Sequence, residues 1–254
     1  MDGIVDINRR AVVPVDEYEL VDSSTIAARI EVALEDARPG LRCLLTPPVY
    51  YSLANGIADN RAVNDALLAA AGERPGWRAC GVAEPKYGAA AVQEIERLAA
   101  LGAAGVVWSP RAQGVFGNDQ SLAELCRHAH GLGLVSMIHS APYSINEGLW
   151  RLWALAAQCP GVPLVLLGAC ESWENIQLIR EHKGGGDNLF YDLSLLSESW
   201  DLDGLAGSIG AEHLLLGSGG ADLFARTLGI VERSGLAAEA KQAILSGNAK
   251  RLFG

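Results

Sequence analysis

The chain has 254 residues, and 50% of them are hydrophobic, which is enough for one large buried core. Its net charge of −10 and pI near 5.0 argue against nucleic acid or anionic membranes as partners, since both bind to basic surfaces. No basic region followed by an apolar run opens the chain, and no apolar stretch approaches the ~20 residues of a membrane span. Five scattered cysteines without a CxxC pair favour reduced thiols, so we expect a cytoplasmic location.

Short aliphatic runs alternate with amphipathic stretches along the whole chain. Runs that are apolar throughout are typical of parallel strands buried on both faces. Amphipathic patterns between them predict helices, including those at residues 23–37, 90–102, 121–133 and 172–186. The predicted strands are Ile4–Ile7, Leu41–Leu45, Trp77–Val82, Gly105–Trp108, Leu134–Ile138, Leu164–Leu167, Leu189–Asp192 and Leu214–Leu216.

Eight strand–helix units in a chain of this length predict a single-domain (β/α)8 TIM barrel over residues 1–254. A doubly wound open sheet is the alternative, but no Gly-x-Gly-x-x-Gly motif follows the first strand. In a TIM barrel the chemistry lies at the carboxyl ends of the strands. The polar residues expected there are Asn8, Arg10, Glu84, Lys86, Arg111, His139, Tyr143, Asp192 and Ser218.

Several segments together carry a family resemblance. They are "GIVDINRRA" at the first strand, "GLVSMIHSAP" at the fifth, and "NLFYDLSLL", "IGAEHLLLGSGGADLF" and "AILSGNAKRLFG" in the last third. In this order and spacing the chain resembles the amidohydrolase-related TIM-barrel proteins, in the branch with amidohydrolase 2 or ACMS decarboxylase-like members. That branch includes small-acid decarboxylases and lactonases. The resemblance spans the whole chain and implies a barrel that acts on a small acid.

The resemblance also implies a divalent metal, and this sequence departs from the family pattern at four of its positions. Asn8 and Arg10 stand where two His of the first strand bind the metal. Gly168 stands at about the strand-six His, Gly219 stands at the strand-eight Asp, and only His139 is kept. A catalytic zinc needs three protein ligands plus water, and a guanidinium stays positively charged. We therefore expect no metal and no cofactor, and hence no metal-hydroxide mechanism.

His139 is the expected proton-transfer group, since it follows a strand at its carboxyl end. Asp192 or Glu84 would assist it. The alternative is a structural histidine, hydrogen-bonded within a filled barrel mouth. Arg10 and Arg111 are expected to clamp a carboxylate, for which a guanidinium is suited. The alternative for Arg10 is an ion pair with Glu84 or Asp192, because a charge in the mouth needs a partner.

The other residues expected to bind the ligand are Asn8, Lys86, Tyr143 and Ser218. Cys170 precedes a predicted helix and is a possible nucleophile, although a small packed residue is the favoured interpretation. Trp150 and Trp153 lie on the predicted helix after strand five. We expect them to pack against a neighbouring element, and an apolar surface there would suit a subunit interface.

Two functions from different classes follow. The first is a metal-free enzyme of the hydrolase or lyase type that binds a small carboxylate-bearing substrate at the mouth. Hydrolysis, lactone opening, decarboxylation and isomerisation all stay open as reactions. The alternative is a catalytically inactive homologue that serves as the partner or regulatory subunit of an active paralogue. For either function we expect a homo-oligomer or a hetero-oligomer with a paralogue.

Overall fold

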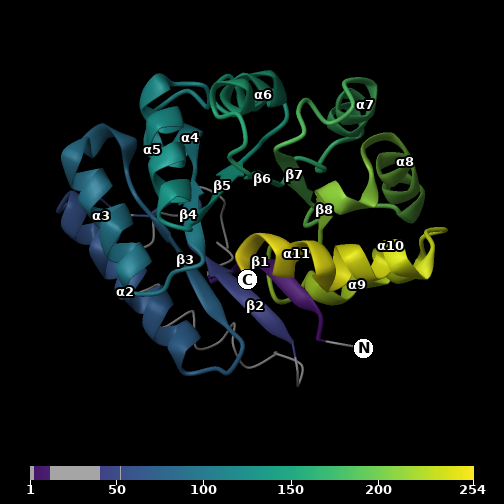
Figure 1. The fold of residues 1–254 in the computed structure, drawn as a ribbon, viewed down its shortest axis with the longest axis horizontal. Helices are drawn as coiled ribbons and strands as arrows, with labels where there is room; N and C mark the ends of the chain where they lie inside the picture. The colour runs from purple at the N-terminus through teal and green to yellow at the C-terminus, as the bar shows by residue number, and fades with distance from the viewer. Residues whose placement is uncertain (1–2, 12–40, 52) are drawn as a thin grey trace.

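A computed structural model describes residues 3–11, 41–51 and 53–254 of the chain. Eight parallel strands form one sheet and follow each other in chain order (Figure 1). Two backbone hydrogen bonds, from Ile7 N to Leu216 O at 2.9 Å and from Gly219 N to Asn8 O at 2.7 Å, join the last strand to the first. The sheet therefore closes, and the predicted (β/α)8 barrel is confirmed. Its strands are β1 (Val5–Arg10), β2 (Arg42–Thr46), β3 (Arg78–Val82), β4 (Gly105–Trp108), β5 (Val135–His139), β6 (Leu164–Leu167), β7 (Leu189–Asp192) and β8 (Leu214–Leu215).

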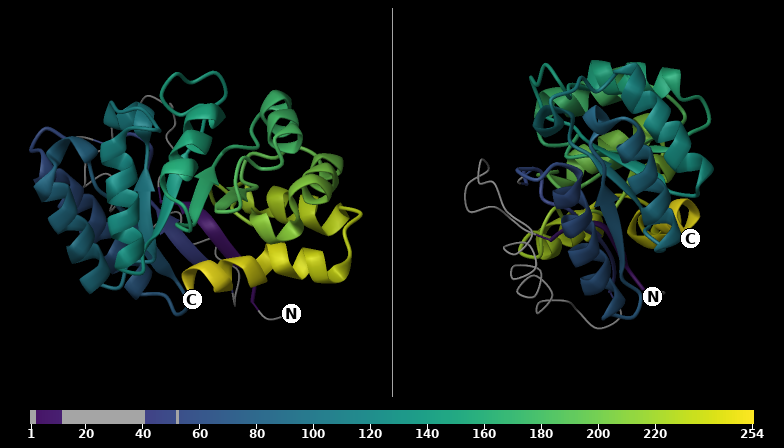
Figure 2. Two further views of the ribbon diagram at one scale, coloured as in Figure 1. Left: turned by 45° about the horizontal axis from the view of Figure 1, so that its top comes forward. Right: turned by 90° about the vertical axis from the view of Figure 1, so that its left-hand side faces the viewer.

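Helices cover the outside of the barrel (Figure 2). The longer ones are α2 (Ile57–Gly72), α3 (Ala89–Ala100), α5 (Gln120–Gly131), α6 (Leu149–Gln158), α7 (Trp173–Glu181), α8 (Ser199–Ile209) and α9 (Phe224–Arg233). The shorter ones are η1 (Pro85–Tyr87), α4 (Pro110–Gln113), η2 (Ala211–His213), α10 (Ala238–Gln242), η3 (Ala243–Gly247) and α11 (Asn248–Phe253). The helix predicted at residues 23–37 lies outside the described residues. Within the described ranges, none of the helices combines the length and the apolar character that a bilayer crossing requires.

The strands alternate between two cores because successive side chains point to opposite faces of a sheet. On β6, Val165 and Leu167 pack inside the barrel, while Leu164 and Leu166 pack under the helices. Both faces are buried, which explains why the strands are apolar throughout. The barrel interior is apolar along most of each strand, and polar side chains such as His139 and Asp192 lie at the carboxyl ends.

Candidate functional site

The first strand carries one extra residue relative to the second. Asp6 pairs with Cys43 and Arg9 pairs with Leu45, so three residues of β1 span two of β2. Such a bulge turns neighbouring side chains to different faces and is common next to active sites. Arg9 shares the helix-facing side with Leu45, is 1% exposed, and has its Nη1 3.9 Å from the Asp6 carboxylate. The sequence analysis missed this pair, whose signal was an acidic and a basic residue three positions apart in one strand.

Asn8 lies at the inner edge of the barrel mouth and is hydrogen-bonded on both sides. Its Nδ2 donates to Asp192 Oδ2 at 2.6 Å, and its Oδ1 accepts from the Thr46 hydroxyl at 2.9 Å. Gly217 permits this close approach, because a Cβ there would lie 2.9 Å from Asp192 Oδ2 and 3.0 Å from Asn8 Cβ. The Asn8 amide therefore serves to hold Asp192 and Thr46 together across the mouth.

Asp192, at the end of β7, accepts hydrogen bonds at both of its oxygens. Oδ1 accepts from the Ser194 hydroxyl at 2.6 Å, from Ser194 N at 3.0 Å and from Gly168 N at 3.2 Å, while Oδ2 accepts from Asn8. Burial raises the pKa of Asp192, and the hydrogen bonds from Ser194, Asn8 and Gly168 oppose that rise. A carboxyl group with this many donors is a structural acceptor first, and its role in proton transfer stays a prediction.

His139 ends β5 and is 7% exposed, on the same face of the strand as Met137 inside the barrel. Its Nε2 makes no hydrogen bond within the described part of the chain. Burial lowers the pKa of His139 to about 3, and the charges of Arg10 and Arg111 add to the effect. The imidazole is therefore neutral at neutral pH, with two guanidinium groups close enough for their charges to act on it.

Arg10 lies level with Thr46 on the inner face of the mouth. Burial lowers the pKa of its guanidinium, and the carboxylates of Asp192 and Glu171 oppose that effect. The charge of Asp192 thus acts on Arg10, and the ion pair between the two residues stays a prediction. The other predicted partner of Arg10, Glu84, contacts different groups.

Arg111 reaches the mouth from α4 and is held by a buried acid. Its backbone N donates to Glu147 Oε2 at 3.1 Å, and its Nε lies 3.5 Å from Glu147 Oε1. The guanidinium is 5.8 Å from the centre of the Tyr50 ring, and the side chain is 42% exposed. Glu147 is 2% exposed and was not singled out from the sequence, because it lies in a loop without any motif. Arg111 therefore stands between the buried mouth and solvent.

Glu84 belongs to a separate cluster beside the mouth. It accepts a 2.6 Å hydrogen bond from the Tyr51 hydroxyl, and the Gln113 amide lies 3.5 Å away. Its Oε2 is 3.6 Å from Lys86 Nζ, and the Lys86 side chain is 46% exposed. The structure thus brings Glu84 and Lys86 together, with Tyr51 rather than His139 in direct contact with the carboxylate.

Three further candidate site residues, Ser218, Tyr143 and Cys170, differ in their contacts and their exposure. The Ser218 hydroxyl donates to Asp6 Oδ2 at 2.6 Å, so it is engaged in holding β8 to β1. Tyr143 is 81% exposed on the rim and adopts a φ of 60°. Cys170 is buried, and burial raises the pKa of its thiol, which opposes the thiolate form that a nucleophile needs.

Gly168 and Gly219 have φ values of +71° and +74°. Residues with a Cβ are strained in this left-handed region. The two glycines that stand where the family resemblance implies metal ligands therefore also meet a backbone requirement of their strand ends. Among the residues that the structure describes, no group of three or more His, Cys, Asp or Glu side chains is arranged to hold a metal ion.

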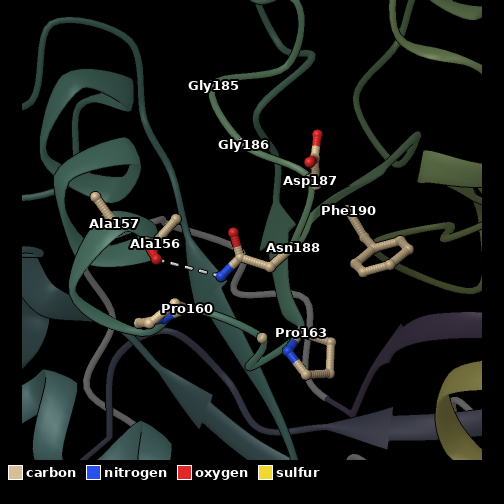
Figure 3. A pocket seen from close by; sticks show the side chains of 10 residues that line it. Ala156, Ala157, Pro160, Pro163, Gly185, Gly186, Asp187, Asn188 and Phe190 are labelled. Atoms are coloured by element: carbon tan, nitrogen blue, oxygen red, sulfur yellow. Dashed lines mark hydrogen bonds between the residues drawn. The ribbon is translucent and has the colours of Figure 1, made fainter.

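A cavity of 640 Å³ opens at the opposite end of the barrel, where β6 and β7 begin (Figure 3). The Asn188 side chain lies on its wall, and its Nδ2 donates to the carbonyl oxygens of Ala156, Cys159 and Val162 at 3.3, 2.9 and 2.9 Å. The Asn188 amide thereby caps the carboxyl end of α6. None of the predicted site residues lies in this wall, so the mouth remains the candidate site.

Comparisons with known proteins find the same fold. The chain is similar to the 5-carboxyvanillate decarboxylase of Sphingomonas paucimobilis, with a TM-score of 0.71, 15% identity, and coverage of 100% of this chain and 99% of that one. A 2,6-dihydroxybenzoate decarboxylase from Rhizobium has a TM-score of 0.70 and 15% identity, with coverage of 100% of this chain and 99% of that one. A third similar structure is a dihydroxybenzoic acid decarboxylase from Polaromonas sp. JS666, solved with bound manganese and the inhibitor 2-nitroresorcinol. Its TM-score is 0.68 and its identity 14%, with coverage of 100% of this chain and 97% of that one.

These TM-scores establish a shared fold, and the search of curated proteins returned no match. The family model named Amidohydro_2, described as amidohydrolase, matches residues 51–254. That range includes six of the eight strands, β3 to β8, together with the strand ends that carry Glu84, His139 and Asp192. With most of its length matched by this model and its whole barrel shared with the decarboxylases, the chain belongs to the amidohydrolase family.

Proposed function

We propose that this protein binds a small carboxylate-bearing molecule at the barrel mouth through Arg10 and Arg111, without a divalent metal at that site. If it turns its ligand over, it acts as a hydrolase or lyase, with His139 as the proton-transfer group. The related structures support the ligand class, since those proteins are decarboxylases of aromatic acids. The finer claims rest on the residues of this chain.

One observation carries the proposal: two guanidinium groups from different elements act on one buried, neutral imidazole. Arg10 comes from β1, Arg111 comes from α4, and both lower the pKa of His139 at the end of β5. A carboxylate that entered between them would receive charge-assisted hydrogen bonds from guanidinium groups, which match its planar geometry. Arg111, being half-exposed, is placed to meet the ligand first.

The residues at the mouth do not fit a divalent metal. Asn8 and Arg10 present an amide engaged with Asp192 and Thr46 and a positive charge. A cation beside Arg10 would be repelled, and His139 alone falls short of the ligand number that such sites use. We therefore assign to Arg10 the positive charge that faces the ligand at this mouth.

The same electrostatics link ligand binding to the basicity of His139. In the ligand-free protein burial, and to a smaller extent the charges of Arg10 and Arg111, disfavour the protonated ring, so the imidazole is a weak base. A bound carboxylate would offset both charges and so remove the smaller of the effects that lower the pKa of His139, while burial would continue to lower it. The ring would then be a better proton acceptor with the ligand in place than without it.

Calorimetric titration of the full chain with benzoate, and with neutral benzamide as the matched ligand, tests the proposal. We expect benzoate to bind and benzamide to fail. Arg111→Gln should weaken benzoate binding about 10-fold or more, the loss expected for one charge-assisted hydrogen bond. Arg226→Gln, on the exposed surface of α9, is the control and should bind as the original protein does. Equal binding of the two ligands, or an unchanged Arg111→Gln variant, contradicts the proposal.

Metal content is measured on the same sample after incubation with manganese and zinc salts and removal of the free ions. We expect far less than one metal per chain by elemental mass spectrometry, and benzoate binding that a chelator leaves unchanged. One retained metal per chain, together with loss of benzoate binding on chelation, would refute the metal-free site.

The second candidate is a homologue that binds the ligand without converting it. It is favoured by the hydrogen bonds that occupy Asp192, because an acceptor saturated by Asn8, Ser194 and Gly168 is poorly available to assist catalysis. Incubation with 2,6-dihydroxybenzoate, followed by chromatography of the products, separates the two. Product formation that is lost in His139→Gln supports the enzyme, and binding without product supports the inactive homologue.

A further inference from the structure

Glu147 is a buried acid in the loop between β5 and α6, and both of its carboxylate oxygens contact one residue. Oε2 accepts a hydrogen bond from the backbone N of Arg111 at 3.1 Å, and Oε1 lies 3.5 Å from Arg111 Nε. Burial of a carboxyl group is costly unless partners compensate for the lost water. Burial accordingly raises the pKa of Glu147, and the backbone N–H and the charge of Arg111 oppose that rise. The buried carboxylate is therefore compensated by Arg111.

The loop that carries Glu147 is fastened to the segment after α4. Asn146 Nδ2 donates to the Val115 carbonyl at 2.8 Å, and Gly117 N donates to the Asn146 carbonyl at 2.6 Å. A Cβ on residue 117 would lie 3.0 Å from that carbonyl oxygen, so glycine permits the close approach. The Ser144 hydroxyl accepts from the backbone N of Asn146 and of Glu147 at 3.3 and 3.2 Å. These bonds fix the backbone from which the Glu147 side chain reaches Arg111.

The same loop begins directly after His139. Strand β5 ends at His139, and β5 pairs with β4, the strand that precedes α4 and Arg111. The charge of Arg111 acts on the His139 ring and helps to lower its pKa. Glu147 thus joins the helix that carries the guanidinium to the loop that continues from the imidazole. The placement of Arg111 relative to His139 depends on this contact.

The contact with Glu147 engages only one side of the guanidinium. The group has five N–H donors in a planar fork and can offer a carboxylate two parallel bonds. In Arg111 it is Nε that faces Glu147, so the end formed by Nη1 and Nη2 remains for a ligand. The side chain is 42% exposed, and its guanidinium carbon lies 5.8 Å from the centre of the Tyr50 ring. Glu147 therefore restricts a side chain that still reaches solvent.

Two effects of Glu147 on an anionic ligand have opposite signs. A long side chain that is ordered only when the ligand binds weakens binding, and a side chain that is already held avoids this cost. The negative charge of Glu147, on the other hand, repels a carboxylate. If the charge were its main effect, removal of the acid would tighten binding. If orientation is its main effect, removal of the acid loosens binding.

We propose that Glu147 is the positioning residue of the ligand site, which holds the guanidinium of Arg111 at the mouth so that its Nη end receives the ligand carboxylate. This inference rests on the proposed function of Arg111 as a ligand-binding group. Glu147 acts through Arg111 and does not itself contact the ligand.

Calorimetric titration with benzoate tests the sign of the effect. Glu147→Gln should weaken benzoate binding about 3- to 10-fold, the range expected when a long side chain must be ordered on binding. Glu147→Asp keeps the charge but withdraws the carboxylate by one methylene, and should weaken binding in the same direction. Glu124→Gln is the matched control: it removes the same charge from the exposed face of α5, where Glu124 accepts from Gln120 at 2.9 Å, and should not weaken binding.

A double-variant comparison shows whether Glu147 acts through Arg111. In the Arg111→Gln background, Glu147→Gln should cause no further loss of benzoate affinity, because the group that it orients is already absent. Far-UV circular dichroism confirms that each variant is folded. Tighter benzoate binding in Glu147→Gln would overturn the proposal, and so would a further loss of affinity in the Arg111→Gln background.

A second measurement needs no ligand. The Nε–Hε group of Arg111 gives its own signal in a proton–nitrogen NMR spectrum, and the loss of that signal in Arg111→Gln assigns it. Its heteronuclear NOE should match that of ordered backbone in the original protein and fall in Glu147→Gln. An unchanged NOE in Glu147→Gln would overturn the proposal. If benzoate does not bind to the original protein, the proposed function fails, and the NOE alone decides whether Glu147 holds the guanidinium.

Discussion

The two ends of the barrel interior are built from different chemistry on the same eight strands. Where the strands begin, the inner face is lined by side chains such as Val5, Val135 and Val165, which need only exclude water. Where the strands end, Asn8, Asp192 and Thr46 exchange directional hydrogen bonds of 2.6 and 2.9 Å. The apolar end tolerates changes that keep its volume, whereas a buried polar network is stable only when each member has its partner.

The largest expected effects come from removing one side chain at each end. Asp192→Ala leaves donors on Asn8, Ser194 and the Gly168 backbone without an acceptor, and should lower the free energy of unfolding by about 3–5 kcal/mol. Met137→Ala at the apolar end leaves a cavity and should cost about 2–5 kcal/mol. Denaturation in urea gives both values.

Conservative variants then separate the two ends. Met137→Leu keeps the volume and should cost less than about 1.5 kcal/mol. Asp192→Asn keeps the volume but turns a donor toward the Asn8 amide, so it should still cost about 2 kcal/mol or more. If Asp192→Asn is tolerated as well as Met137→Leu, the contrast between the two ends is wrong.

A smaller effect is expected from acid, and it concerns His139. In the unfolded chain the imidazole takes up a proton through its ordinary pKa of 6.5, while in the folded protein it stays neutral until the pKa of about 3. The unfolded state therefore binds more protons in this range, and the stabilising contribution of the neutral ring, complete above the unfolded pKa, is lost as the pH falls. The slope has an upper limit of ~1.4 kcal/mol per pH unit.

His139→Gln removes this contribution, so its free energy of unfolding should fall less steeply with acid than that of the original protein. The buried carboxyls of Asp6 and Asp192 act with the opposite sign, because their raised pKa values favour the folded state at low pH. Both proteins share that opposing contribution, and their difference isolates His139. Parallel stability curves for the two proteins would show that the ring titrates normally.

The smallest effects concern two glycines. Gly168→Ala places a Cβ at a φ of +71°, 3.3 Å from the Ser140 carbonyl oxygen, and should cost about 1–2 kcal/mol. Gly207→Ala, in an exposed turn of α8 with open space around the new Cβ, should instead stabilise the protein by about 0.5–1 kcal/mol. Thermal unfolding of both variants checks the signs. If the Gly168→Ala protein is as stable as the original, the positive φ at this position does not require glycine.

Much of the fold follows from local patterns in the sequence. Val165, Leu166 and Leu167 form part of a short run that is apolar on both faces, and such a run is typical of a parallel strand between two cores. Eight of them separated by amphipathic stretches predicted the barrel, and the location of His139 and Asp192 at strand ends followed from it.

The partners of the polar residues could not be predicted in the same way. Glu147 holds Arg111, and Ser218 binds Asp6 from the far end of the chain. These contacts join residues of widely separated elements, and their geometry depends on a bulge in β1 and on the missing side chain of Gly217. No periodicity records them, because each hydrogen bond depends on positions fixed to a few tenths of an ångström.

The sequence by itself determined the barrel, its apolar interior and the end at which polar side chains gather, since hydrophobic periodicity is a local property that each segment carries alone. Only the tertiary structure decided that Asn8 binds Asp192, that Arg10 and Arg111 act together on His139, and that Trp150 faces outward while Trp153 is anchored. Those outcomes depend on distances between elements, which exist only once the sheet has closed.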